Sequence, residues 1–136
     1  FIASSKNPNS AYHGKGFVAR LSGSTIEFIS MWKIMMFGRE VFTQKNGELI
    51  FMPRPAIPRY LIPADGKVRA TLLGEIEVEY QFRADKDYIP GNYVIENMHF
   101  VYKNKNEADT LAGQVAGKLA EDVRECKVAK VTITLR

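Results

Sequence analysis

The chain has 136 residues, of which 46% are hydrophobic and 25% are charged, and its formal net charge is +4 at pH 7. This size and composition are typical of one globular domain with a sizeable core. Lys and Arg are scattered and never form a run of three, so the positive charge does not predict a nucleic-acid partner. The longest strongly apolar stretch, 26–37, is too short to span a bilayer, so we expect no membrane segment.

Cysteine and histidine usage argues against a disulfide framework and a metal centre. Cys126 is the only cysteine, which excludes an intrachain disulfide and a cysteine-rich zinc site. His13 and His99 lie far apart in the sequence, without further ligands at metal spacing. The chain begins at Phe1 and shows no pattern typical of a secretion signal. We therefore expect a fragment or a processed product without metal or cofactor, with a cytoplasmic location favoured over a secreted one.

Residues 1–20 carry turn chemistry and little periodicity, which predicts a loop. Their apolar side chains are too numerous for a disordered tail. These side chains are Phe1, Ile2, Tyr12, Phe17 and Val18. We therefore expect the loop to lie against another surface.

The segment after this loop has the clearest helix signal in the chain. Ser24 and Glu27 have the spacing of a capping box, and Gly38 supplies a left-handed stop. The clearly polar positions Glu27, Ser30 and Lys33 recur every third residue and form one narrow strip, so the helix is apolar over most of its circumference. Such a helix needs neighbours on several sides, and we expect them upstream of this chain. The alternative is a central helix wrapped by its own sheet in a small α+β domain.

From Val41 onward, turn signals and alternating residues predict an antiparallel β-rich module. Asn46-Gly47 is a tight-turn signal, and the prolines between positions 53 and 63 exclude helix and central strand there. The expected strands are 48–52, 68–73, 76–82, about 93–102 and 131–135. In strand 76–82, apolar residues alternate with glutamates and Gln81, so one face should be buried and the other wet.

A second helix is expected at about 112–125. Val115, Leu119 and Val123 form one apolar stripe, so the helix should pack on one side only. Cys126 stands where a C-terminal glycine would be favoured. The expected organisation is therefore a loop and helix over 1–40, followed by a β-rich module over 41–136.

The stretch from Gly16 through the turn Leu-Ser-Gly-Ser-Thr, which ends at Thr25, into the helix that ends at Gly38 resembles the last barrel segment of cellobiose-phosphorylase-like enzymes. In that family a Leu-Thr-Gly-Thr or Leu-Ser-Gly-Thr turn opens a late helix of an (α/α)6 barrel, and the chain then enters a C-terminal β-sandwich. The proline-rich segment PRPAIPRYL and the strand at 73–78 follow in a similar order. The resemblance covers about residues 1–82 in detail.

Two positions depart from the family pattern. Arg20 stands where an aromatic residue is frequent, and Ser22 stands where a threonine precedes the turn glycine. Both departures favour a hydrolase or a related transferase over a phosphorylase. The resemblance implies an α+β chain, in which one buried helix from the end of an (α/α)6 barrel is followed by an antiparallel β-sandwich-like module with one further helix.

The resemblance also implies an anion or sugar subsite at the start of the first helix. The family's turn threonine and glycine help to hold inorganic phosphate, and the matching residues are Ser22 and Gly23. A hydroxyl and backbone amides at a helix N-terminus suit an anion. The alternative is that the hydroxyl residues of this turn only cap the helix. The candidate phosphate- or sugar-binding residues are Ser22, Gly23, Ser24, Thr25, Arg20 and His13.

No catalytic residue is expected in this chain. Glycoside cleavage requires a carboxylic acid that protonates the leaving oxygen, and in the family this acid lies upstream of the turn. Glu27 is the only carboxylate of the matched helix and is explained as the capping partner. Glu75, Glu77 and Glu79 share one strand face, which is more typical of a wet face than of an acid and base pair.

We therefore expect the C-terminal portion of a glycoside phosphorylase or hydrolase that acts on β-glucan-type oligosaccharides and is inactive as an isolated chain. Inorganic phosphate would be a substrate rather than a cofactor. The expected partners are the rest of the parent enzyme or a separately encoded catalytic barrel, and an oligosaccharide, with no nucleic acid and no membrane. The alternative is an independent carbohydrate-binding or structural module without catalysis.

Overall fold

The structure is a computed structural model that describes residues 3–16 and 22–136. The chain divides into two compact units, Phe1–Trp32 and Lys33–Arg136. The first unit contains the short 3-10 helix η1 (Ser10–Tyr12) and the start of helix α1 (Ser22–Phe37). The boundary between the two units therefore falls inside α1.

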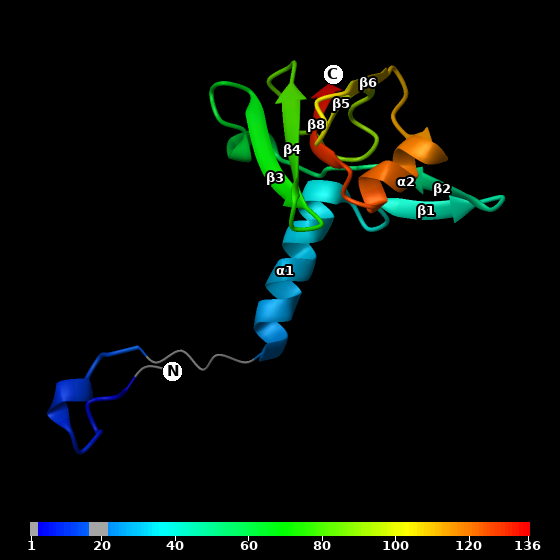
Figure 1. The fold of residues 1–136 in the computed structure, drawn as a ribbon. Helices are drawn as coiled ribbons and strands as arrows, with labels where there is room; N and C mark the ends of the chain where they lie inside the picture. The colour runs from blue at the N-terminus through cyan, green and yellow to red at the C-terminus, as the bar shows by residue number, and fades with distance from the viewer. Residues whose placement is uncertain (1–2, 17–21) are drawn as a thin grey trace. The chain divides into compact units, whose positions relative to one another are not determined.

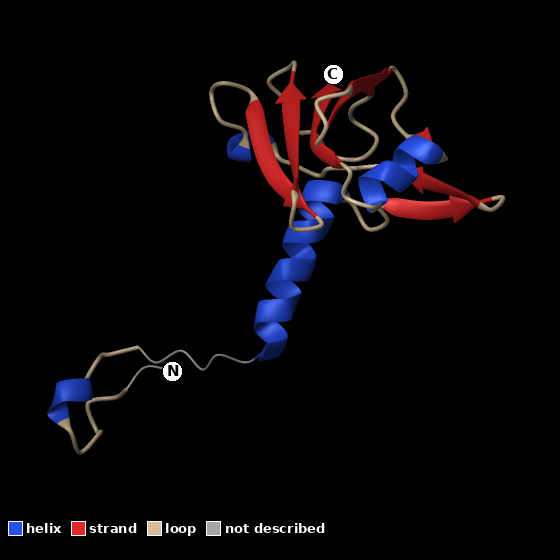
Figure 2. Ribbon diagram, in the orientation of Figure 1, coloured by secondary structure: helices blue, strands red, loops and turns tan. Residues whose placement is uncertain are grey.

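The second unit is an α+β structure with two sheets (Figures 1 and 2). The larger sheet has the order β3 (Lys67–Leu72), β4 (Ile76–Phe82), β8 (Val128–Leu135), β5 (Ile95–Tyr102) and β6 (Glu107–Thr110). The smaller sheet has the order β1 (Phe42–Lys45), β2 (Glu48–Phe51) and β7 (Val115–Ala116). The α+β class is thus confirmed, but the larger sheet is mixed rather than antiparallel, because β4 and β8 run parallel.

Turn residues define the two hairpins. Asn46 and Gly47 have φ of 52° and 80° and join β1 to β2, as their turn signal predicts. Leu73 and Gly74 have φ of 52° and 76° and lie in the loop between β3 and β4. The strand expected at 68–73 therefore ends at Leu72, and Gly74 belongs to a turn.

The second helix, α2 (Lys118–Arg124), is shorter than the expected 112–125. Val115 and Ala116 pair with β2 instead, and Gly117 then takes a positive φ of 64°. The helix ends as expected at Cys126, whose φ is 56°. Cys126 N donates to Val123 O (3.1 Å) and Lys127 N donates to Asp122 O (2.9 Å), which is the hydrogen-bond pattern of a Schellman motif.

Hydrogen bonds to its last backbone carbonyls connect the C-terminal end of α1 to the rest of the second unit. The last carbonyls of a helix lack intrahelical donors and need partners elsewhere. Here these donors come from the left-handed Gly38, from the proline-rich segment and from a tyrosine of β4. The hydrogen bonds are Gly38 N to Ile34 O (2.9 Å), Ala56 N to Met35 O (2.7 Å), Tyr80 Oη to Met36 O (2.6 Å) and Arg54 N to Phe37 O (2.9 Å). The predicted stop at Gly38 is confirmed.

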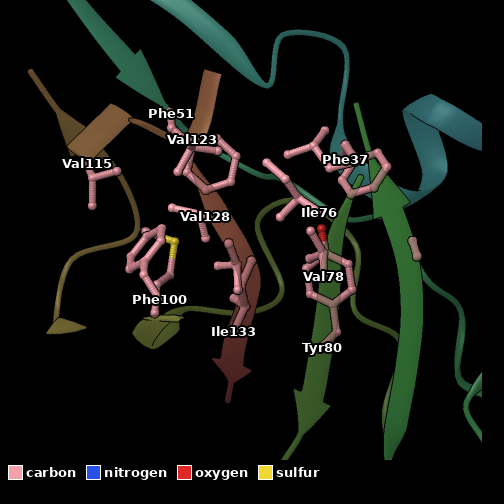
Figure 3. Packing of buried hydrophobic residues seen from close by; sticks show 14 of the residues in the cluster. Phe37, Phe51, Ile76, Val78, Tyr80, Phe100, Val115, Val123, Val128 and Ile133 are labelled. Carbon is pink, nitrogen blue, oxygen red and sulfur yellow. The ribbon is translucent and has the colours of Figure 1, made fainter. Parts of the chain in front are cut away.

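One apolar core holds the second unit together (Figure 3). Side chains from β4, β5, β8, β2 and α2 meet in it, and Phe37 adds the end of α1. The largest side chains that are fully buried are Tyr80, Tyr88, Phe51, Phe100, Ile57, Ile76 and Met98. Burial of each large apolar side chain contributes about 1.5–3 kcal/mol, so this cluster is the main source of stability.

The earlier turns of α1 expose apolar side chains. Ile26, Phe28, Ile29 and Met31 are 65%, 72%, 61% and 64% exposed. A helix that is apolar around its circumference requires cover, and in the described part of the chain these four side chains remain exposed. In the described part of the chain, every helix is too short or too polar to cross a membrane.

Candidate functional site

The predicted anion or sugar subsite lies in the first turn of α1. Ser22, Gly23, Ser24 and Thr25 are all helical, so the structure brings their backbone amides together at one helix end. The helix begins at Ser22 rather than just after Ser24, so Ser24 lies inside the first turn and is not the N-cap. Arg20 and the side chains of Ser22 and Ser24 lie outside the described residues.

Gly23 is exposed and makes no close packing contact. A Cβ added to Gly23 would meet no heavy atom within 4 Å. Glycine is less stable than alanine by about 1 kcal/mol in a helix interior, but Gly23 is the second residue of α1, so this full cost does not apply to it.

His13 belongs to a separate short loop. Its Nε2 atom lies 2.8 Å from Asn7 O, and the loop is closed by Ala3 N, which donates to Lys15 O at 3.1 Å. The side chain is exposed, and its described contact is with this loop rather than with the first turn of α1.

The glutamates of β4 are not a uniformly wet face, contrary to expectation. Glu79 is only 4% exposed, although it points away from the core side of the sheet that Val78 and Tyr80 occupy. Its carboxylate accepts from Gln81 Nε2 (2.9 Å), and also from two cations of the flanking strands. These are Arg69 Nε at 2.8 Å and Lys130 Nζ at 3.2 Å.

These donors keep Glu79 ionised. The hydrogen bond from Gln81 is the largest cause, and with those from Arg69 and Lys130 it lowers the pKa of Glu79 to about 2 against the opposing effect of burial. Glu77 contacts Lys130 Nζ at 2.9 Å. A carboxylate that stays ionised cannot protonate a leaving group, so Glu79 does not suit general-acid catalysis.

A second charged cluster lies at the end of α2 and was not predicted from the sequence. The nearly buried Asp122 accepts from Lys118 Nζ (2.7 Å), Tyr102 Oη (3.1 Å) and Lys127 Nζ (3.3 Å). The hydrogen bond from Lys118 is the largest cause that lowers the pKa of Asp122. The i,i+4 spacing of Lys118 and Asp122 could have indicated this pair. Cys126, half-buried, lines a cavity of about 490 Å³ beside it.

Several tyrosines belong to the core or its edge and do not present a ring on which a sugar could stack. Tyr80 and Tyr88 are fully buried, and burial raises the pKa of Tyr93 to about 12 while its hydroxyl donates to Pro55 O at 2.9 Å. Tyr60 is the most exposed tyrosine of the described residues, with an exposed fraction of 83% against 44% for Tyr12. His99 pairs with Asp109 at 2.8 Å, and within residues 3–16 and 22–136 no group of three His, Cys, Asp or Glu side chains could hold a metal ion.

Comparison with known proteins adds no identification to this geometry. No model of a known protein family and no curated protein matches the chain.

Proposed function

We propose that the chain is the C-terminal portion of a glycoside phosphorylase or hydrolase that acts on β-glucan-type oligosaccharides. In this proposal it supplies an anion or sugar subsite at the start of α1 but not the catalytic acid. The observation that carries the proposal is the apolar exposure of α1, where Ile26, Phe28, Ile29 and Met31 are 61–72% exposed. Exposed apolar surface of this kind is typical of a face that further polypeptide covers, and the helices of a barrel would provide that cover.

The first turn of α1 supports the proposed subsite. A helix of 16 residues carries partial positive charge at its N-terminus, and its first amides have no intrahelical acceptor. The open position of Gly23 allows a phosphate or a sugar oxygen to approach these amides. The carboxylates of β4 are engaged by cations, so the proton donor would belong to the rest of the enzyme.

A test of this proposal uses the natural protein, purified from its source through an affinity tag at its C-terminus. The preparation is given cellobiose-series oligosaccharides with and without inorganic phosphate, and glucose 1-phosphate and free reducing sugar are measured. We expect sugar turnover to purify with the chain. A preparation that contains this chain as an isolated monomer without turnover would contradict the proposal.

Gly23→Ala separates ligand binding from folding. Alanine should stabilise the helix by up to about 1 kcal/mol, because nothing obstructs its Cβ, yet it narrows the approach to the first-turn amides. We expect kcat/KM for phosphate or oligosaccharide to fall by about tenfold while the melting temperature does not fall. Ala11→Gly changes an exposed position in the loop at residues 3–16 and serves as the control. Unchanged kinetics in Gly23→Ala would exclude the subsite.

A second candidate function is an independent carbohydrate-binding or structural module, because the core cluster lies entirely between Phe37 and Leu135. The unit Lys33–Arg136 therefore has its own hydrophobic core. Calorimetric titration of the whole chain with β-glucan oligosaccharides tests this function. Saturable heat that disappears in Tyr60→Ala, but not in Tyr12→Ala, would favour the module.

A further inference from the structure

A cavity of about 570 Å³ lies where the end of α1 meets the proline-rich segment. Its apolar wall is formed by Ile34, Met52, Ala56 and Pro90. A smaller cavity of about 230 Å³ shares Arg54 and Pro90 with it and is also lined by Tyr93. Cavities of several hundred Å³ are the usual size for small-molecule sites.

The backbone of Arg54 is fixed against the end of α1. Arg54 N donates to Phe37 O at 2.9 Å, and Gly38 approaches from the helix side with a φ of 87°. A Cβ added to Gly38 would lie 3.0 Å from Arg54 O and 3.1 Å from Arg54 Cβ. Only glycine can adopt this φ and also lie this close to Arg54. The fold therefore fixes the backbone position of Arg54 at the cavity.

The larger cavity carries an excess of positive charge. Arg39 and Arg54 line it together with one carboxylate, Glu40. Lys33 Nζ donates to Arg39 O at 3.0 Å and adds a third cation nearby. Among the residues that the structure describes, no carboxylate oxygen lies within 4.0 Å of the guanidinium of Arg39 or Arg54. Arg54 Nη2 donates to a thioether, Met52 Sδ, at 3.1 Å.

Arg83 and Arg124 of the same unit likewise have no carboxylate oxygen within 4.0 Å among the described residues, and Arg39 and Arg54 differ from them in lining one cavity together. Three other arginines are paired with carboxylates. The pairs are Arg59 with Asp85, Arg69 with Glu79, and Arg136 with Glu96. A guanidinium group presents a planar fork of donors that matches a carboxylate or a phosphate. Two such groups without a carboxylate partner, beside an apolar wall, form a complementary surface for a small acidic molecule.

We infer that the larger cavity binds a sugar-sized molecule through a phosphate or carboxylate group. The guanidinium groups of Arg39 and Arg54 contact the anion, and the apolar wall lies beneath the rest of the molecule. All of the lining residues belong to Lys33–Arg136, and none of them is a candidate at the start of α1. The inference therefore does not rest on the proposed function.

Titration of the whole chain tests the inference. The probes are inorganic phosphate, D-glucose 1-phosphate and D-glucuronate, with D-glucose as the neutral control, and binding is followed by calorimetry and by the arginine Nε–Hε resonances in NMR. We expect saturable binding of a charged sugar, with shifts at Arg39 and Arg54 and none at Arg136. Tighter binding of glucose 1-phosphate assigns the ligand group as a phosphate, and tighter binding of glucuronate assigns it as a carboxylate.

Arg54→Gln removes the central charge and is expected to weaken binding by about tenfold or more. Arg136→Gln removes one charge away from the cavity and should leave the affinity unchanged. Equal weakening by both variants, equal affinity for glucose, or no saturable binding of any anion would overturn the inference. If Arg54→Gln does not fold, the arginine resonances of the unaltered chain show whether the anion contacts Arg39 and Arg54.

Discussion

Glu79 shows how a single carboxylate is stabilised inside a polar sheet face. Gln81 on its own strand, Arg69 on β3 and Lys130 on β8 all donate to it. Cross-strand partners that satisfy a buried charge offset its desolvation, whereas removal of the charge leaves the donors without their acceptor. The alternating sequence of β4 predicts the face on which Glu79 lies, but it does not predict burial, because the covering side chains come from other strands.

The lowered pKa of Glu79 predicts a loss of stability in acid. Folding lowers this pKa from 4.5 to about 2, so between these values the unfolded state binds more protons than the folded state. The free energy of unfolding should therefore fall as the pH drops from about 5 towards 2, by at most about 3 kcal/mol from this residue. Urea unfolding at a series of pH values in Glu79→Gln should show a flatter profile than in the unaltered chain.

Glu107→Gln is the matched control for this prediction. Glu107 is an exposed glutamate of β6 in the same sheet. Its replacement should leave the acid profile as it is. Identical profiles for Glu79→Gln and the unaltered chain would show that Glu79 is not held ionised by the fold.

At the scale of elements, the end of α1 depends on hydrogen bonds from distant segments. Tyr80 Oη donates to Met36 O at 2.6 Å from the middle of the core. Tyr80→Phe keeps the ring but leaves this carbonyl without its donor, which should destabilise the chain by about 1–2 kcal/mol. Tyr60→Phe removes an equivalent hydroxyl from an exposed ring and should change stability by less than about 0.5 kcal/mol. Equal melting temperatures of the two variants would contradict this role.

The two helices show what local sequence can and cannot determine. Gly38 and Cys126 end α1 and α2 as predicted, because a left-handed residue is a local requirement of the helix stop. The start of α2 was predicted too early, because the alanine-rich stripe suits a helix. Val115 and Ala116 instead pair with β2, a contact with residues far away in the sequence that overrides helix propensity.

At the scale of the whole molecule, we expect opposite effects on stability from substitutions of the exposed side chains of α1 and of the buried Phe37. Phe28→Gln with Ile29→Gln should leave the stability of the Lys33–Arg136 unit nearly unchanged, because both side chains are exposed. The same double variant should abolish self-association of the isolated chain, as measured by sedimentation velocity. Phe37→Gln should instead cost about 3–5 kcal/mol, because Phe37 is 2% exposed within the core. A double variant that associates as strongly as the unaltered chain would contradict this assignment.

The candidate sites differ in how far the sequence reveals them. The first turn of α1 could be found from a short motif, because its residues are consecutive. The cavity lined by Arg39 and Arg54 could not be found from a motif, because its wall combines residues from the end of α1, the proline-rich segment and Pro90. The sequence does not show which of the scattered arginines line one cavity together, whereas the fold does. The sequence did not predict the mixed arrangement of the larger sheet either, since the parallel pairing of β4 with β8 joins distant segments.

The place of β8 has a consequence for the synthesis of the protein. β8 lies between β4 and β5 in the larger sheet, yet it follows every other strand of that sheet in the sequence (Figure 1). While the ribosome is still translating, β3 with β4 and β5 with β6 can form only as two separate hairpins with open edges. The sheet becomes continuous when Val128–Leu135 has left the ribosome, so the nascent chain should depend on chaperones until then.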